Sequence, residues 1–180
     1  MFGFLIGGHD TTSGTMRWGF KYLADNPSAQ HKLRQELHST LTSPTLLEIT
    51  KAHLPYLDAF IEETLRHSLT AQTMVREAKK DTQILGHHIP KGTEVWCMNN
   101  AYGYLKPDFG GQIDENKRSA SSRDAKDRTG AWDVRDMHLF KPERWLKTSA
   151  DGRVECDLRA GPSMPFGAGP RGCFGMSYDD

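Results

Sequence analysis

The residues best suited to chemistry lie in one short segment, PFGAGPRGCFG, residues 165–175. Gly167, Gly169 and Gly172 fit the pattern G-x-G-x-x-G, which lets a dinucleotide pyrophosphate approach the backbone at a helix N-terminus. The same segment presents Cys173 at the end of a glycine-rich loop, where its sulfur could ligate a buried metal. The segment therefore predicts either a nucleotide or a haem, and the rest of the chain must decide.

The nucleotide interpretation needs elements that this sequence does not offer. A dinucleotide loop follows a buried parallel strand, opens a helix, and has an acidic residue about 20 positions later. Pro162 and Pro165 disfavour a central strand before the loop, and only residues 176–180 follow it. The match to the glycine pattern is thus more simply explained as accidental.

A second group suited to chemistry is Asp10 beside Thr11, in the stretch GGHDTT. A helix with Gly7, Gly8 and a competing threonine side chain can widen locally and admit oxygen and water. Such a pair could relay protons to reduced dioxygen. The alternatives are two surface residues near a glycine kink, or a metal pair formed with His9, for which we identify no further ligands.

Glu63 and Arg66 form a third pair, three residues apart on a predicted helix. The simplest interpretation is an exposed ion pair that contributes roughly 0.2 to 0.5 kcal/mol. Helical periodicity places Glu63 near Tyr56 and Phe60, at the edge of an apolar stripe, and this leaves its burial open.

The elements that must position these groups are mainly helices. Helically spaced apolar residues predict a long helix over residues 2–24, interrupted by glycines. Asn26 can cap the next helix, with Pro27 at its first position. Residues 54–67, LPYLDAFIEETLRH, predict a further helix. Its apolar stripe consists of Leu57, Phe60, Ile61 and Leu65.

The middle of the chain has a different character. Residues 82–85 and 93–98 predict short strands joined by tight turns, and hence a small sheet. Residues 111–130 hold one isoleucine among charges, serines and glycines, which predicts a mobile polar insertion. The expected fold class is mainly α with a small β-sheet.

The composition excludes several classes of function. The formal net charge is +0 with both signs mixed, so no extended basic surface indicates nucleic acid or an anionic membrane. Three widely spaced cysteines fit neither a disulfide framework nor a C-x-x-C zinc site, and they favour a reducing compartment. The apolar run at the start is far shorter than the roughly 18 to 20 residues that span a bilayer. We expect no membrane segment in this chain.

Four stretches, in the right order, resemble the cytochrome P450 family of haem-thiolate monooxygenases, of the eukaryotic, fungal type. Residues 166–175 match the haem-binding signature F-G-x-G-x-R-x-C-x-G at every fixed position. GGHDTT resembles the oxygen-activating helix, and Glu63 to Arg66 resemble the E-x-x-R motif. The sequence Pro-Glu-Arg-Trp at residues 142–145 resembles the P-E-R-F/W element.

The resemblance implies an incomplete, C-terminal part of the cytochrome P450 fold over residues 1–180. Its expected parts are an oxygen-binding helix, an E-x-x-R helix, the polar mobile insertion and a haem-ligand loop, at residues 1–25, 54–67, 111–130 and 165–175. The family's N-terminal half, with any membrane anchor, would be missing.

The resemblance also implies roles for single residues. Cys173 would be the thiolate ligand of haem iron, and a thiolate favours O–O cleavage by donating electron density. Thr11 would be the proton-relay alcohol and Asp10 its acid partner. The haem propionates would pair with Arg171 and Arg76. The remaining contacts of the cofactor-binding loop would come from Phe166, Gly167 and Gly175.

Glu63 and Arg66 would join Arg144 in a structural network behind the haem, in which one carboxylate bridges two planar guanidiniums. We expect these three residues to be structural rather than catalytic.

The implied function is insertion of one oxygen atom of O2 into a small apolar organic substrate. Haem b would be the cofactor, and NADPH would supply electrons through NADPH–cytochrome P450 reductase. The family suggests association with the endoplasmic reticulum membrane. We expect the isolated chain to be inactive, and the alternative is a non-catalytic remnant or interaction module without bound haem.

Overall fold

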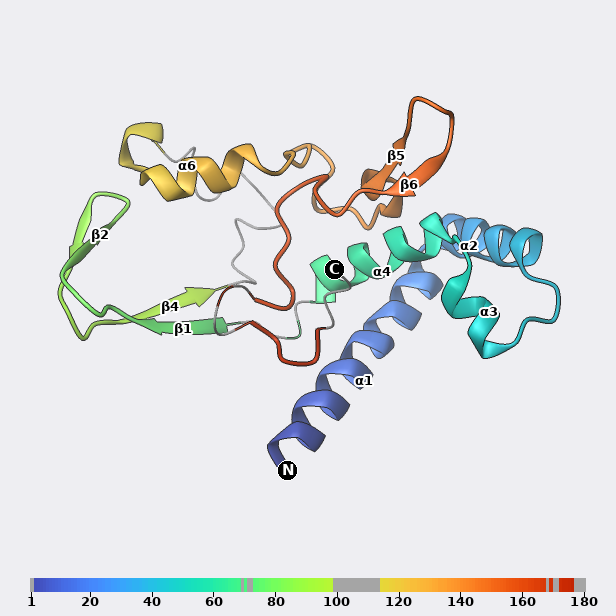
Figure 1. Cartoon of the computed structure of the whole chain (residues 1–180), viewed down its shortest axis with the longest axis horizontal. Helices are drawn as coiled ribbons and strands as arrows, with labels where there is room; N and C mark the ends of the chain where they lie inside the picture. The colour runs from blue at the N-terminus through green and yellow to red at the C-terminus, as the bar shows by residue number, and fades with distance from the viewer. Residues whose placement is uncertain are drawn as a thin grey trace. The chain divides into compact units, whose positions relative to one another are not determined.

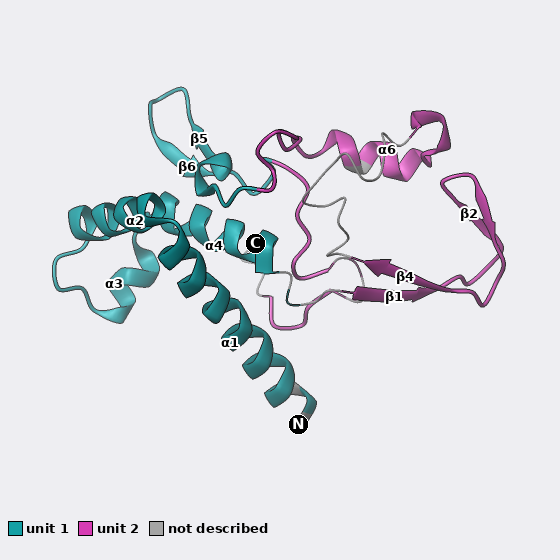
Figure 2. Cartoon of the chain, turned by 180° about the vertical axis from the view of Figure 1, so that it is seen from behind, with its two compact units in different colours: residues 1–70, 139–160 teal, residues 71–138, 161–180 magenta. Residues whose placement is uncertain are grey.

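The structure is a computed structural model that describes residues 2–68, 70, 73–98, 114–167, 169 and 172–176, without the side chains of Phe2, Phe4 and Ala125. The chain divides into two compact units, coloured separately in Figure 2. Unit 1 comprises Met1–Thr70 and Leu139–Ala160, and unit 2 comprises Ala71–His138 and Gly161–Asp180.

Four helices form most of unit 1 (Figure 1): α1 Phe2–Asp25, α2 Pro27–Thr40, α3 Leu46–Lys51 and α4 Pro55–Ser68. The long first helix is confirmed, and it runs through its glycines without a break. The helix predicted over residues 54–67 is confirmed as α4. We did not predict α3, although its start carries a signal: Thr45 and Glu48 form a capping box, in which each side chain binds the other's backbone N–H.

The junction between α1 and α2 differs from the prediction in one detail. Pro27 occupies the first turn of α2, as expected, but the Asn26 side chain makes no cap. Its Nδ2 instead donates to the carbonyl of Tyr22 at 2.9 Å. The last carbonyls of a helix lack intrahelical partners, and the one-residue junction places Asn26 within reach of them.

The start of α4 is capped from another helix. Glu36 of α2 accepts hydrogen bonds from the backbone N–H groups of Tyr56 at 2.8 Å and Leu57 at 2.9 Å. These N–H groups belong to the first turn, where a helix has no carbonyl partner of its own, and a negative charge is favoured there. Glu36 thus ties α2 to the N-terminus of α4.

The core of unit 1 is a cluster of Leu33, Tyr56 and Phe60. The predicted stripe of α4 is only partly correct, because Ile61 is 44% exposed while Glu63 is completely buried. The buried face of α4 is shifted toward Tyr56, Phe60 and Glu63, since Glu63 finds polar partners inside the unit. Further side chains pack against the cluster: Leu23, Leu37, Leu57, Phe140 and Leu146.

Among the residues that the structure describes, the predicted β-structure is present as three separate two-stranded antiparallel sheets rather than one sheet. In unit 2, β1 Thr73–Glu77 pairs with β4 Glu94–Met98, and β2 Thr82–Ile84 pairs with β3 His87–Ile89. In unit 1, β5 Leu146–Thr148 pairs with β6 Val154–Cys156. Helices with small antiparallel sheets agree with the expected class.

The polar segment predicted to be a mobile insertion contains local helical structure: η2 Glu115–Lys117 and α6 Ala120–Asp127, while residues 111–113 lie outside the described residues. Polar contacts hold it. The Ser119 hydroxyl caps α6 by accepting from the N–H of Ser122, and Glu115 pairs with Lys126 at 2.6 Å. Its mobility stays a prediction, and these contacts are of the exposed kind that contributes about 0–1 kcal/mol each.

Within the part of the chain that the structure describes, no helix combines the length and the apolar character that crossing a bilayer requires.

Candidate functional site

The segment predicted to ligate haem forms a closed, hydrogen-bonded loop in unit 2. The N–H of Cys173 donates to the carbonyl of Phe166 at 2.7 Å, and the N–H of Gly172 donates to the carbonyl of Gly169 at 2.9 Å. Gly167 and Gly169 have φ angles of 71° and 68°. Because side chains other than glycine rarely adopt this left-handed conformation, the two glycines let the chain fold back and bring Cys173 beside Phe166.

The sulfur of Cys173 fits an axial haem ligand. Its thiol is free and exposed. The chain passes near the sulfur two residues later, since a Cβ added at Gly175 would be in ordinary contact with Sγ at 3.9 Å. Phe166 and Phe174 belong to the same loop, and their side chains are 37% and 87% exposed. Among the described residues, no three His, Cys, Asp or Glu side chains gather into a metal site. One accessible sulfur in a loop with exposed aromatic residues suits a cofactor that brings its other iron donors with it.

The two arginines predicted to bind propionates have different outcomes. Arg171 lies outside the described residues. Arg76 lies on β1, is exposed, and donates from Nη1 to the carbonyl of Val75 at 3.0 Å. The propionate role of each stays a prediction.

Asp10 and Thr11 lie on α1. The Thr11 hydroxyl donates to the carbonyl of Gly7 at 2.5 Å, and so competes with the helix hydrogen bond to that carbonyl. Oδ1 of Asp10 lies 2.9 Å from Nδ1 of His9, and the two side chains are 70% and 78% exposed. The predicted local widening is not visible, because α1 keeps α-helical geometry from Phe2 to Asp25. The hydroxyl and the carboxylate nevertheless lie on consecutive residues with a titratable imidazole beside them.

Glu63 is the centre of a buried polar network in unit 1. Arg66 donates to its carboxylate twice, each time at 2.9 Å, and Nε of Arg144 donates at 3.0 Å. The backbone N–H of Lys141 and the indole Nε1 of Trp145 donate at 2.9 Å each. The structure thus brings Glu63, Arg66 and Arg144 together around one carboxylate.

The burial of Glu63 and Arg66 excludes the simple surface-pair interpretation, because both side chains are 0% exposed. Burial alone would raise the pKa of Glu63. The hydrogen bonds from Arg66 and His67, together with the charge of Arg66, outweigh burial and hold the pKa of Glu63 well below its ordinary value. Glu63 is therefore a fixed anion that organises its neighbours, and it is unsuited to proton transfer near neutral pH.

Sequence reasoning missed two members of this network. Trp145 contributes an indole N–H, and the only signal for it was its place after Arg144 in the P-E-R-F/W resemblance. His67 lies four residues after Glu63, with Nε2 3.3 Å from the carboxylate, and its ring contacts those of Tyr22 and Phe140. The i,i+4 spacing on α4 could have indicated His67.

A second, smaller cluster surrounds Glu143. Oε1 of this residue accepts from Lys32 of α2 at 2.5 Å and from the Tyr56 hydroxyl at 3.1 Å. Burial acts to raise the pKa of Glu143, but the hydrogen bonds from Lys32 and Tyr56 lower it overall. Burial and the negative charge of Glu143 raise the pKa of Tyr56 above its ordinary value. Glu143 thus links α2 and α4 to the segment that carries Arg144.

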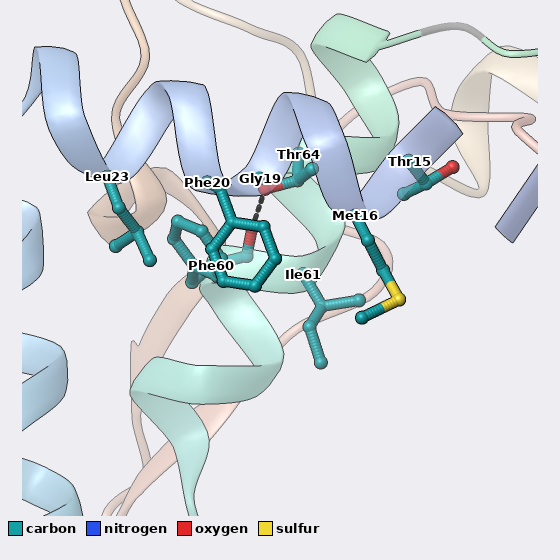
Figure 3. Close-up of a pocket in the computed structure, with 8 residues that line it drawn as sticks. All are labelled: Thr15, Met16, Gly19, Phe20, Leu23, Phe60, Ile61 and Thr64. Atoms are coloured by element: carbon teal, nitrogen blue, oxygen red, sulfur yellow. Dashed lines mark hydrogen bonds between the residues drawn. The ribbon is translucent and has the colours of Figure 1, made fainter. Parts of the chain in front are cut away.

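An open apolar groove of about 250 Å³ runs between α1 and α4 (Figure 3). The two helices approach each other at Gly19, where a Cβ would be in ordinary contact with Cγ2 of Thr64 at 3.6 Å. Met16 and Phe20 remain 56% and 66% exposed, and the groove offers no charged group. It is a packing surface rather than a site for chemistry. Its lining consists of Thr15, Met16, Gly19, Phe20, Leu23, Phe60, Ile61 and Thr64.

Comparison with known proteins identifies the family. A family model described as Cytochrome P450 matches residues 1–106 and 136–177, which include the helix of Thr11, the network of Glu63 and the loop of Cys173. The stretch that the family model does not match, residues 107–135, contains the whole polar segment of residues 111–130.

Three of the similar curated proteins are fungal monooxygenases. The chain is 44% identical to "Cytochrome P450 monooxygenase GME11363" of Pestalotiopsis microspora, over 98% of the chain and 32% of that protein. It is 44% identical to "Cytochrome P450 monooxygenase TRI13" of Fusarium sporotrichioides, over 97% of the chain and 33% of that protein. A cytochrome P450 monooxygenase of Dothistroma septosporum, cyp3.1, is 38% identical over 97% of the chain and 61% of its own length.

The chain therefore spans about a third of the length of the first two relatives. The family match reaches from α1 to the Cys173 loop, and the similarity to the first relative covers 98% of the chain. The chain belongs to the cytochrome P450 family.

Proposed function

We propose that this chain forms part of a haem-thiolate monooxygenase in which Cys173 is the iron ligand. The protein would insert one oxygen atom of O2 into a small apolar organic substrate, while the other atom accepts protons and electrons and leaves as water. The observation that carries the proposal is the exposed Cys173 thiol in a loop closed by its own N–H on the carbonyl of Phe166 at 2.7 Å.

Different residues are proposed to bind different parts of the cofactor. When bound, haem b supplies the iron that binds and activates O2, and the thiolate increases its electron density. Cys173 offers the sulfur, Gly167 gives the loop its turn, and Gly175 is proposed as a further residue of the cofactor-binding loop. Phe166 provides an apolar surface next to the ligand. Arg171 and Arg76 are proposed to pair with the propionates.

Asp10 and Thr11 are proposed as the proton-delivering groups. The Thr11 hydroxyl donates its proton to the carbonyl of Gly7, and rotation about the Cα–Cβ bond would turn that proton toward another acceptor. The Asp10 carboxylate is 70% exposed, so it can exchange protons with water or with His9. We propose that these two groups form a short acid–alcohol relay on one helix.

Glu63, Arg66 and Arg144 are proposed to act through structure. Their buried contacts fix the end of α4 to the segment before β5, and no proton transfer is assigned to them. Breaking a buried ion pair by removing one partner costs about 3–5 kcal/mol, so this network is expected to be essential for folding.

The partners follow from the family. We propose that NADPH supplies electrons through NADPH–cytochrome P450 reductase and that the protein works at the endoplasmic reticulum membrane. The substrate class is a lipid, terpenoid or xenobiotic. Turnover by residues 1–180 alone is not expected, because Leu5, Ile6 and Phe20 of α1 are 65%, 47% and 66% exposed and leave an apolar helix face uncovered.

The test uses a hybrid protein in which residues 1–180 replace the matching third of the Pestalotiopsis microspora relative. Purified hybrid and isolated chain are mixed with hemin, reduced and exposed to carbon monoxide. We expect a stable, red-shifted, thiolate-type Soret band from the hybrid and none from the isolated chain. Absence of the band from a folded hybrid would contradict the proposed function.

The second candidate is a non-catalytic remnant or interaction module without bound haem. The exposed apolar residues of α1 are the observation that favours it, because such a face normally contacts other protein. A folded hybrid that takes up no hemin would support this candidate. Uptake with a thiolate-type band would exclude it.

A further inference from the structure

Trp132 and Gly161 make an unusually close contact in unit 2. A Cβ built on Gly161 would overlap Cδ2 and Cε2 of Trp132 and would lie 2.7 Å from Cε3. Real Cβ atoms are essentially never found under 3.0 Å from another heavy atom, so no side chain fits at residue 161 while the indole stays in place. The indole Nε1 also donates to the carbonyl of Pro162 at 2.9 Å. One aromatic side chain therefore contacts two consecutive residues by its ring and by its N–H.

Trp132 is attached to an ordered turn that gives the contact a fixed base. Oδ1 of Asp133 accepts from the backbone N–H of Arg135 at 3.0 Å. The carbonyl of Asp133 accepts from the N–H groups of Asp136 at 3.2 Å and Met137 at 2.9 Å. Met137 is only 9% exposed. The residue after Trp132 is thus held by several hydrogen bonds and a buried side chain.

The other side of the contact leads directly into the ligand loop. Ser163 alone separates Pro162 from Met164, whose carbonyl accepts from the N–H of Gly167 at 3.2 Å. Two residues further on, the carbonyl of Phe166 accepts from the N–H of Cys173. A series of contacts, each only a few residues along the chain from the next, therefore connects Trp132 to Cys173.

We propose that Trp132 is a positioning residue: its clamp on Gly161 and Pro162 fixes how the chain enters the loop, and so where Cys173 presents its sulfur. The purpose of the clamp rests on the proposed function of Cys173, while the clamp itself is a property of the folded chain. An indole is suited to this role because its apolar ring packs on a glycine backbone and its N–H finds a partner.

The first test measures amide hydrogen exchange in the 180-residue chain without haem. The amides of Gly167 and Cys173 report the loop. In Trp132→Ala we expect their exchange to rise about 5- to 30-fold, while the amides of α4 in unit 1 keep their rates. Trp96→Ala is the matched control, because Trp96 is in the same unit but 63% exposed, and it should leave the loop amides unchanged.

Gly161→Ala separates a steric clamp from general loss of stability. Alone, it should accelerate the loop amides as Trp132→Ala does, because the new methyl group displaces the indole. In the Trp132→Ala background it should add less than about twofold, since the clash is gone. Additive effects, or unchanged loop exchange in Trp132→Ala, would overturn the proposal.

A spectroscopic arm connects the clamp to the ligand. In the hybrid protein, Trp132→Ala should convert a large part of the thiolate-type Soret band into the neutral-thiol type, and Trp96→Ala should not. If the unsubstituted hybrid has no thiolate-type band, the proposed function fails and the exchange experiment alone decides on the clamp. If the band is present and unaffected by Trp132→Ala, the proposed function stands and the positioning role is contradicted.

Discussion

The indole Nε1 of Trp145 donates a hydrogen bond to Oε2 of Glu63 over 2.9 Å, and both side chains are completely buried. The short helix η3 Pro142–Trp145 therefore contributes an indole as well as the guanidinium of Arg144 to the carboxylate on α4. Because a carboxylate can accept about four hydrogen bonds, the donors around Glu63 use its full capacity. The aromatic residue at position 145 is thus part of the polar network as well as of the packing.

Trp145→Phe tests this hydrogen bond. The ring would still fill most of the space, but Oε2 would lose the indole N–H and keep the bond from Nε of Arg66. We expect a loss of about 1–3 kcal/mol in the free energy of unfolding, measured by urea titration, because a buried acceptor loses a partner. Trp18→Phe, at a site that is 44% exposed, is the control. Equal stability of the two variants would contradict the role of the indole.

Glu63→Gln should destabilise the chain by about 3–5 kcal/mol, because it leaves Arg66 buried without its anion. The adjacent Glu62 provides a matched control, because its pKa is shifted in the opposite direction to that of Glu63. Burial, followed by the charge of Asp58, raises the pKa of Glu62. Glu62→Gln should therefore be neutral or slightly stabilising at pH 7. A similar loss in both variants would show that the network around Glu63 is not special.

The lowered pKa of Glu63 also predicts how the stability of the chain responds to acid. The pKa of Glu63 is lowered in the folded chain from an ordinary value of 4.5, so its contribution to stability is complete above about pH 4.5 and is lost as the pH falls through the folded pKa. The free energy of unfolding of the unsubstituted chain should fall below pH 4.5. Glu63→Gln should show a shallower fall over that range. Parallel pH profiles would disprove the linkage.

How much of the network around Glu63 could be predicted depends on how far its hydrogen-bond donors lie from it in the sequence. Helical periodicity was sufficient to place α4, and the resemblance brought Glu63, Arg66 and Arg144 into one proposal. Periodicity counts apolar residues, however, so it placed Ile61 inside and left the burial of Glu63 open. Burial of a carboxylate depends on donors that are distant in sequence, and Lys141 lies 78 residues from Glu63.

Helix caps could likewise be predicted when the capping residue is a sequence neighbour, and not when it lies far away along the chain. The capping box of Thr45 and Glu48 lies within four residues and was readable from the sequence. Asn26 carries the signal of a cap, yet its side chain binds the preceding helix instead. The cap of α4 comes from Glu36, 20 residues before Tyr56, and no local pattern indicates it.

Glu36→Ala tests that distant cap. Loss of both hydrogen bonds to the first turn of α4 should cost about 0.5–2 kcal/mol, the range found for N-cap removal. Gln35→Ala on the exposed face of α2 should have little effect. Urea unfolding of the two variants provides the comparison, and a cost for Gln35→Ala as large as that for Glu36→Ala would refute the capping role.

The three cysteines should differ in reactivity. Burial, with the nearby charges of Glu62 and Asp58, raises the pKa of Cys156 to about 12, whereas Cys97 and Cys173 are exposed. Since the thiolate is the nucleophile, iodoacetamide at pH 8 should modify Cys156 at least about tenfold more slowly than the other two. Peptide mass spectrometry measures the rates, with the urea-denatured chain as control. Equal rates in the folded chain would contradict the burial of Cys156.

The central claim is that Cys173 is the ligand of haem iron. Its most direct test is the carbon monoxide spectrum of the reduced hybrid protein with each cysteine changed to serine in turn. We predict that Cys97→Ser and Cys156→Ser retain the red-shifted, thiolate-type Soret band and that Cys173→Ser loses it. Survival of the band in Cys173→Ser would contradict the account.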